Sequence, residues 1–259
     1  MKLKLKYKRE MKMNFNDREK IIALTPLWKG ERLPDGRPKV EDKYLDALYG
    51  MTLEEVWKPI FVLGYEHQFV GGGENPLNTL HDDGRKLVGR AVTCTYCPTR
   101  PDLHDVQFAR GAEDGLQGNY NQWVIDHLYE RDVVVCDMYD KIYKGTFLGG
   151  NLTTALHNRT KTGGAVIWGG IRDVEQMKKV PDVQVYYRGI DPTPIREFVM
   201  KDWNDITNFG GAVCLPGDIV FGAGGGVLFI PAHLVADVVE GAAKTHVKDD
   251  FGFEMICQG

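Results

Sequence analysis

Two glycine pairs, each followed closely by polar residues, are the stretches of this 259-residue chain best suited to chemistry. Gly149-Gly150 precedes Asn151-Leu152-Thr153-Thr154, and Gly169-Gly170 precedes Arg172-Asp173. A glycine pair where the chain turns into a helix lets the backbone approach a ligand closely and aims unpaired N–H groups at an anion. We therefore expect two anion sites of the size of a carboxylate.

Arg172 and Asp173 offer complementary functions. An arginine presents a planar fork suited to bidentate carboxylate binding, and an aspartate is a hard oxygen ligand for a divalent metal. Adjacent residues on a first helical turn point in different directions, so one would hold a substrate while the other reaches a metal. The alternative is that Asp173 only complements the helix dipole and that Arg172 is a surface cation.

Other chemical patterns are less complete. Gly222-Ala223-Gly224-Gly225-Gly226 lies between two strand-like runs, which indicates a tight hairpin rather than a dinucleotide-binding turn. His104-Asp105 follows a strand-like run and is a weaker candidate for an active-site loop. The chain contains no serine, nucleophile elbow or P-loop, which excludes ordinary serine hydrolases and nucleoside triphosphatases.

The five cysteines form no regular framework, which favours reduced thiols and a cytoplasmic location. Cys94 and Cys97 have the C-x-x-C spacing of redox and zinc sites. However, they end a strand-like run before Pro98 rather than begin a helix, so we expect them to be structural.

Composition excludes further classes of protein. With 32 Lys+Arg against 36 Asp+Glu, the net charge is −4 and no basic excess is available for nucleic acid. No apolar run is long enough to span a membrane. Residues 1–13 are rich in lysine and could be a strand, a basic arm or sequence translated from upstream of Met11 or Met13; we expect a disordered tail.

The elements that must position these residues differ on the two sides of a glycine-rich loop at 71–76. Residues 14–80 predict a helical extension, with helices before Gly50 and after the N-cap Thr52. Residues 81–259 predict an α/β domain with partly parallel strands. The expected strands are 88–96, 133–137, 164–168, 183–187, 218–222 and 226–230, and the expected helices are 104–115, 119–130, 151–162, 172–179 and 232–247.

Several ordered motifs together resemble the RraA-like family, over about residues 85–243. The motifs are Gly149-Gly150-Asn151-Leu152 with Arg172-Asp173 twenty residues on, Tyr187-Arg188-Gly189-Ile190-Asp191-Pro192, Pro216-Gly217-Asp218-Ile219-Val220 and Val227-Leu228-Phe229-Ile230-Pro231. This family includes 4-hydroxy-4-methyl-2-oxoglutarate aldolases, oxaloacetate decarboxylases and the regulator of ribonuclease E activity. Its members are often mislabelled demethylmenaquinone methyltransferases.

The resemblance implies a layered β/β/α domain assembled as trimers or hexamers, with active sites between subunits. In the family's aldolases Mg²⁺ or Mn²⁺ binds a 2-oxo acid and stabilises the enolate formed when a C–C bond breaks. By position, Asp173 would be the metal ligand and Arg172 would hold the carboxylate or oxo group.

The resemblance also implies further substrate contacts. Backbone N–H groups around Leu152 and Thr153 would help to bind the acid, together with Gly150 and Asn151. Asn119, or as a second choice Asn121, would match an asparagine that lines the pocket. A neighbouring subunit could supply a carboxylate for proton transfer, which the sequence does not identify.

Three features depart from the family pattern. The aldolases carry aspartate where this chain has Asn151, which can hydrogen-bond a catalytic water but cannot take its proton. The usual acidic turn between the last two strands is Ala223-Gly224-Gly225, and the first 80 or so residues extend the N-terminal part. Decarboxylation, which needs no base to start it, tolerates Asn151 better than aldol cleavage does.

The leading hypothesis is therefore a divalent-metal-dependent lyase acting on a small 2-oxo acid, either an aldolase or an oxaloacetate-type decarboxylase. The competing hypothesis is a non-catalytic, protein-binding regulator. Retention of Arg172-Asp173 favours the enzyme. A quinone methyltransferase finds little support, because no glycine-rich loop follows a first strand.

Overall fold

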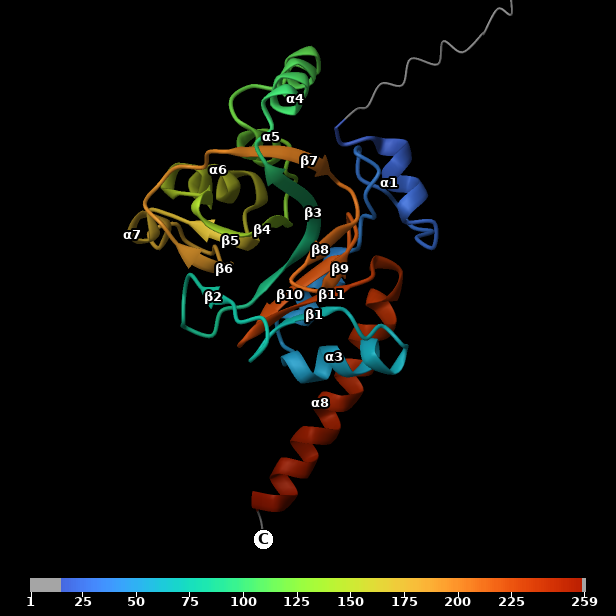
Figure 1. Cartoon of the computed structure of the whole chain (residues 1–259). Coiled ribbons are helices and arrows are strands. Elements are labelled where there is room, and N and C mark those ends of the chain that lie inside the picture. Colours follow the sequence, from blue (N-terminus) through green and yellow to red (C-terminus); the bar gives the residue numbers. More distant parts are fainter. Residues whose placement is uncertain (1–14, 258–259) are drawn as a thin grey trace, which may run out of the picture.

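A mixed β-sheet of nine strands forms the centre of the computed structural model, which describes residues 15–257 (Figure 1). The strands follow the order β1-β11-β10-β3-β4-β5-β6-β2, and β7 pairs with β3 beyond the end of β10. The sheet strands are β1 (Phe69–Gly71), β2 (Asn78–Thr79), β3 (Leu87–Pro98), β4 (Asp132–Leu148), β5 (Gly164–Ile171), β6 (Val185–Ile190), β7 (Phe198–Trp203), β10 (Ile219–Ala223) and β11 (Gly226–Ile230). A separate hairpin joins β8 (Thr207–Phe209) to β9 (Ala212–Cys214).

The middle of the sheet is parallel, as the sequence predicts. Strands β3, β4, β5 and β6 run in the same direction, and the chain returns between them through helices. The connecting helices are α4 (Pro101–Glu113), α5 (Tyr120–Asp126), α6 (Gly150–Thr160) and α7 (Val174–Met177). Parallel strands place their carboxyl ends at one edge, so the residues after β4 and β5 meet there.

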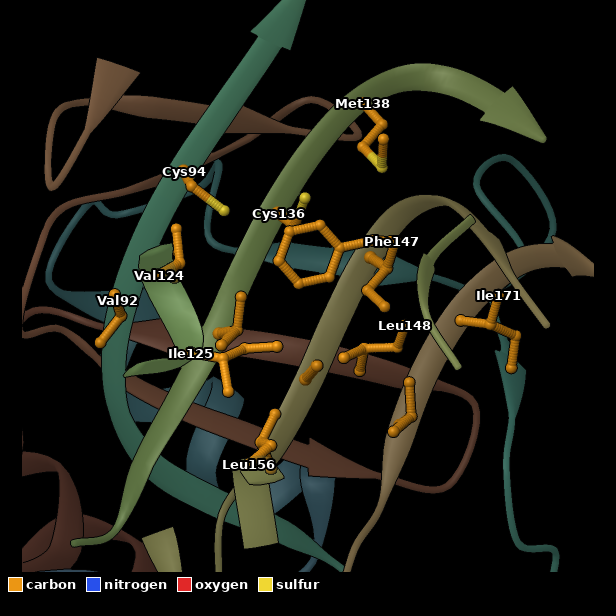
Figure 2. Close-up of a cluster of buried hydrophobic side chains, with 14 of the residues drawn as sticks. Val92, Cys94, Val124, Ile125, Cys136, Met138, Phe147, Leu148, Leu156 and Ile171 are labelled. Carbon is orange, nitrogen blue, oxygen red and sulfur yellow. The ribbon is translucent and has the colours of Figure 1, made fainter. Parts of the chain in front are cut away.

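Successive side chains of a strand point to opposite faces of the sheet, and this alternation builds two apolar layers. Val134 and Cys136 of β4 belong to the same buried cluster as Val124 of α5 and Leu156 of α6. Figure 2 shows Cys136 in this cluster with Leu156 and with Phe147, which lies near the end of β4. Val135, the residue between Val134 and Cys136, faces the other way, into a cluster shared with residues of β10, β11 and the β8–β9 hairpin. The sheet therefore curls so that β10 and β11 pack against one face of the parallel strands, and helices cover the outer faces of the two layers. This arrangement confirms the predicted layered α/β class.

A third apolar layer covers β10 and β11 with helices from both ends of the chain. These are α2 (Asp42–Leu48) and α3 (Leu53–Val62) from the N-terminal part, with the short turn Ala232–Leu234 and α8 (Val235–Cys257) from the C-terminal part. Helix α1 (Arg18–Leu24) lies apart from this layer, and its Lys20 forms an ion pair with Asp205. The predicted N-cap of α3 is confirmed, because Thr52 and Glu55 form a complete capping box. Leu45, Val56 and Val238 are fully buried between these helices and the sheet.

A buried ion pair joins the N-terminal part to the parallel strands. Arg37 donates to both carboxylate oxygens of Asp132, at 2.9 and 2.7 Å, and all atoms of both side chains are inaccessible to solvent. Asp35 accepts a further bond of 2.7 Å from Arg37. The two carboxylates, one of them bound in a bidentate geometry, compensate the charge of the buried guanidinium. They raise the pKa of Arg37, although burial alone would lower it.

The structure corrects several sequence predictions. Gly169 and Gly170 lie inside β5 rather than at a turn into a helix, and the helix expected over 172–179 shortens to α7. β4 continues well past residue 137, with irregular pairing to β5 beyond Asp137. The strands β1, β2, β7, β8 and β9 were not predicted.

Helix α8 extends ten residues past its predicted end and projects from the body of the protein (Figure 1). Its buried residues, Val235, Val238 and Ala242, all lie in its first third. Across residues 15–257, no helix combines the length and apolar character needed to cross a membrane. The predicted basic tail at 1–13 lies outside the described residues.

Candidate active site

A cavity of about 300 Å³ opens where β4 and β5 end and α6 and α7 begin. Its walls come from four segments of the chain that are distant in sequence. It is lined by Asn119, Asn121, Gln122, Thr146, Phe147, Gly149, Asn151, Leu152, Arg172, Asp173, Gln176, Pro194 and Ile195. Among these residues Arg172 and Asp173 carry the charged side chains.

The first turn of α6 presents backbone donors on this side of the sheet. Gly149 is the N-cap residue and its carbonyl oxygen accepts the N–H of Thr153 at 3.0 Å. The N–H groups of Gly150, Asn151 and Leu152 precede that bond, so the helix offers them no intrahelical acceptor. The positive end of the helix dipole adds to their attraction for an anion.

Arg172 and Asp173 converge on this turn rather than diverge. Asp173 has a left-handed backbone, with φ of 56°, and this conformation directs its carboxylate back toward α6. Its Oδ2 atom lies 3.3 Å from the N atom of Gly150 and 3.8 Å from Nε of Arg172. The expectation of opposite directions assumed a helical turn, and the left-handed residue removes that assumption.

The two glycines make this close approach possible. A Cβ atom at Gly149 would lie 2.6 Å from Oδ2 of Asp173, and one at Gly150 would lie 2.4 Å from Oε1 of Gln176. Both distances are shorter than real carbon–oxygen contacts, so any side chain here would displace a residue of the cavity wall. The glycine pair therefore leaves the space that Asp173 and Gln176 occupy.

Amide side chains supply most of the remaining polar surface. Asn121 is buried and donates to the carbonyl oxygen of Phe147 at 2.9 Å, so its orientation is fixed. Asn119 is exposed at the start of α5 and makes no capping hydrogen bond with its side chain. Both asparagines considered from the sequence line the cavity.

Most of the predicted site residues come together here. Asn119, Asn151, Leu152, Arg172 and Asp173 line the cavity. The N–H of Gly150 faces Asp173 at its edge.

Thr153 is placed differently. It is fully buried, and both its hydroxyl and its N–H donate to the carbonyl oxygen of Gly149. Neither group is directed at the cavity.

Gln122, Gln176 and residues 194–195 also line the cavity, although no sequence motif predicts them as site residues. Gln176 lies three residues after Asp173 and Gln122 three after Asn119, spacings that place side chains on the same face of a helix. Pro194 and Ile195 follow the Asp191-Pro192 motif, and their loop is held because Thr146 donates through its hydroxyl to the carbonyl oxygen of Thr193.

The donor set fits a hard divalent cation that keeps much of its water. Mg²⁺ is typically bound by one or two carboxylates and several waters, and it accepts oxygen ligands from a bound substrate. Asp173 has a side chain 34% exposed, so its carboxylate is accessible beside amide oxygens. Within residues 15–257, no three His, Cys, Asp or Glu side chains gather in a way that could enclose a metal. A closed structural metal site is therefore not formed by these residues.

The other candidate patterns lie elsewhere. Gly224-Gly225 is the tip of the β10–β11 hairpin, as predicted. Cys94 is buried on β3, Cys97 is partly buried near its end, and both are free thiols. His104 hydrogen-bonds to the hydroxyl of Tyr120 at 3.2 Å within an aromatic cluster and does not line the cavity.

The layered fold and this glycine-initiated helix beside an Arg-Asp pair define an RraA-like protein. The chain belongs to the RraA-like family (Aldolase/RraA), whose sequence profile matches residues 63–229. Protein DlpA of Legionella pneumophila is 31% identical over 158 residues, which are 60% of this chain but only 23% of that protein. The chain thus matches about a quarter of that relative's length.

Two solved structures show the same fold. One is Streptomyces coelicolor RraAS2, described as an unusual member of the RNase ES inhibitor RraA protein family; it has a TM-score of 0.69 and 21% identity, covering 84% of this chain and all of that one. An uncharacterized protein from Pseudomonas syringae pv. tomato has a TM-score of 0.68 and 19% identity, covering 89% of this chain and 95% of that one. The family includes both lyases and regulators, so membership alone does not select an activity.

Proposed function

We propose that this protein is a divalent-metal-dependent lyase that cleaves a carbon–carbon bond of a small 2-oxo acid. The observation that carries the proposal is the convergence of Arg172, Asp173 and the first turn of α6 on one cavity. A guanidinium and helix N–H groups suit a carboxylate, and the adjacent aspartate suits a metal that would bind the oxo oxygen. Mg²⁺ or Mn²⁺ is the cofactor that we infer.

In this reaction the substrate is bound by Arg172 and by the first turn of α6. Arg172 holds the carboxylate or the oxo group, and the N–H groups of Asn151 and Leu152 bind the same end of the acid. The metal, held by Asp173, supplies a positive charge next to the oxo oxygen when it is bound. Fixed donors stabilise the negative charge that develops on that oxygen more strongly in the transition state than in the substrate.

The bond that breaks lies one carbon away from the oxo group. In decarboxylation its electron pair moves toward the oxo oxygen, carbon dioxide leaves, and a proton from water completes the product at the adjacent carbon. Aldol cleavage additionally requires a base that removes the proton of a hydroxyl group. Asn151 can orient a water but cannot accept that proton, which favours decarboxylation for this site.

The decisive experiment measures pyruvate released from oxaloacetate and from 4-hydroxy-4-methyl-2-oxoglutarate. Full-length protein is assayed with Mg²⁺ or Mn²⁺ and with EDTA, and the metal's own catalysis is subtracted. We expect metal-dependent turnover, faster for oxaloacetate. Failure to turn over either acid, together with no Mn²⁺ binding, would contradict the proposal.

Two variants and a matched control assign the roles. Asp173→Ala should abolish both metal binding and turnover, and Arg172→Ala should mainly raise KM for the acid. Glu175→Gln removes an exposed carboxylate from the same segment without touching the cavity, so it should leave activity unchanged. Wild-type activity in Asp173→Ala would remove Asp173 from the mechanism.

The alternative is a non-catalytic, protein-binding regulator. It is favoured by Asn151, which leaves the cavity without the base expected of an aldolase, and by the fold shared with RraAS2. Under either function we infer a homotrimer or hexamer with sites between subunits. Sedimentation of the purified protein tests that assembly.

A further inference from the structure

A second cavity, of about 280 Å³, lies on the other side of the fold, between the N-terminal part and the β8–β9 hairpin. Its lining is mainly apolar and includes Leu24, Pro26, Trp28, Tyr65, Leu215 and Pro231. None of its residues lines the candidate active site. Its volume is at the lower end of those typical for small-molecule sites, which fits one ring with a short side chain.

The wall contributed by the N-terminal part is held by hydrogen bonds. Arg32 donates to the hydroxyl and the carbonyl oxygen of Thr25, each at 2.8 Å, and to the carbonyl oxygen of Gly36 at 2.7 Å. The indole N–H of Trp28 donates to the carbonyl oxygen of Glu31 at 2.8 Å, which fixes the ring. The cavity is therefore shaped before any ligand enters, and binding need not order this loop.

Asp218 lines the opposite wall and is only 4% exposed. It ends a tight turn in which the backbone of Leu215 donates to its carboxylate at 2.8 Å. Gly217 in this turn has φ of 88° and packs against Pro38, where a Cβ atom would lie 2.4 Å from Cδ. The carboxylate is thus positioned by backbone geometry rather than by a side-chain partner.

Asp218 is a buried carboxyl group without a cation beside it. Asp132, the buried aspartate of β4 described above, is neutralised by Arg37. For Asp218, no Lys or Arg nitrogen of residues 15–257 comes within ion-pair distance, and no Lys or Arg lines the cavity. Burial raises the pKa of Asp218 to about 7, against the effect of its backbone hydrogen bonds. A buried carboxylate is costly unless a positive charge pairs with it.

The aromatic side chains of the lining also favour a positively charged ligand. Trp28 and Tyr65 present π-systems, whose faces attract cations. The hydroxyl of Tyr65 lies 3.4 Å from Nε2 of His233, and burial lowers the pKa of that histidine, which disfavours its charged form. The cavity contributes no positive charge of its own to compete with a ligand.

We propose that this cavity binds a small organic ammonium compound with an aromatic body. The ring lies among the apolar side chains and the ammonium group pairs with the carboxylate of Asp218. This binding site is independent of the proposed lyase reaction, because the two cavities share no residue.

Calorimetric titration of the full-length protein at about pH 8 tests the proposal. The probes are phenethylamine, which is cationic at this pH, and phenethyl alcohol, which has the same ring and chain length but no charge. We expect saturable binding of the amine, roughly tenfold tighter than that of the alcohol.

Three variants identify the site. Asp218→Asn removes the charge while keeping an acceptor, and Leu27→Arg places a positive charge on a lining residue that is 60% exposed. Both should reduce the affinity for the amine to that for the alcohol. As a control, Asp237→Asn removes an exposed carboxylate of α8 and should change neither the affinity for the amine nor that for the alcohol.

Three outcomes would overturn the proposal. They are equal affinity for the two probes, no saturable binding of the amine, and an amine preference that survives in both Asp218→Asn and Leu27→Arg. If Asp218→Asn does not fold, Leu27→Arg decides the test, because its side chain is at the surface.

Discussion

Oδ2 of Asp173 lies 3.3 Å from the backbone N atom of Gly150 and 3.8 Å from Nε of Arg172. One carboxylate oxygen therefore lies beside Arg172 and at the first turn of α6, where we expect the substrate's carboxylate to bind. A metal ion bound to Asp173 would neutralise this oxygen, and the acid would then meet less repulsion. Metal and acid should consequently bind with positive coupling.

Asp173→Asn separates the two roles of this side chain. The variant should lose Mn²⁺ binding, but it should bind oxalate more tightly than metal-free wild-type protein does, because a negative charge beside Arg172 has been removed. Calorimetry with oxalate in EDTA measures this affinity. Weaker oxalate binding in the variant would show that the carboxylate does not oppose the anion.

Gly149→Ala should disturb the site more than the fold. Gly149 has an extended backbone that alanine can adopt, but the new Cβ atom would meet Oδ2 of Asp173 at 2.6 Å. We expect Mn²⁺ affinity to fall by roughly ten- to a hundredfold, as when other residues that orient a metal ligand are changed. Gly225→Ala is the matched control, because its Cβ atom would have no atom within 4 Å. Equal Mn²⁺ affinity in both variants would contradict this prediction.

The ion pair between Arg37 and Asp132 should be sensitive to the loss of one partner. Asp132→Asn leaves the guanidinium buried with Asp35 as its remaining carboxylate. We expect the free energy of unfolding to fall by about 3 kcal/mol, measured by urea denaturation. Glu240→Gln, which breaks the exposed pair with Lys244, should have little effect. Similar losses in the two variants would mean that burial does not matter here.

Asp218 should make the free energy of unfolding fall as pH rises, which is opposite to the usual effect of an aspartate. Its pKa is about 7 in the folded protein and near 3.8 in the unfolded chain, so between these values the folded state binds more protons. The group therefore stabilises the fold at low pH, and this contribution is lost as pH rises through 7. From pH 6 to pH 8 the loss is about 1 kcal/mol.

Comparison with Asp218→Asn isolates this contribution from those of other groups. The variant lacks the titrating carboxyl, so its free energy of unfolding should fall less than that of the wild type over the same range. Urea denaturation of both proteins at the two pH values measures the difference. Parallel pH profiles would exclude Asp218 as the cause.

The parallel strands could be predicted because each is a short apolar run, such as Val133–Val135, bounded by helical segments. The unpredicted strands are of two kinds. β1, β2, β8 and β9 each contain three residues or fewer, and their strand form depends on pairing of β1 with β11, β2 with β6, and β8 with β9. Such pairing is not visible in the local sequence. β7 mixes charged and apolar residues, and its strand form depends on pairing with β3.

The residue types of the candidate site were also predictable, but their geometry was not. The glycine pair and Arg172-Asp173 indicate an anion site from sequence alone. Their mutual approach depends on the left-handed backbone at Asp173 and on the extension of β5 through Gly169 and Gly170. Both features result from tertiary packing, so spacing along the chain could not reveal them.

Helix α8 has a consequence for the time course of amide hydrogen exchange. Its first third is anchored by Val235, Val238 and Ala242, whereas Phe251, Phe253 and Ile256 further along are 65%, 70% and 81% exposed. A helical segment of about twelve residues without packing is only marginally stable in water. One continuous helix should therefore exchange in two regimes, slow near its start and fast toward Cys257. Protection of the outer half would directly report any surface that comes to cover it.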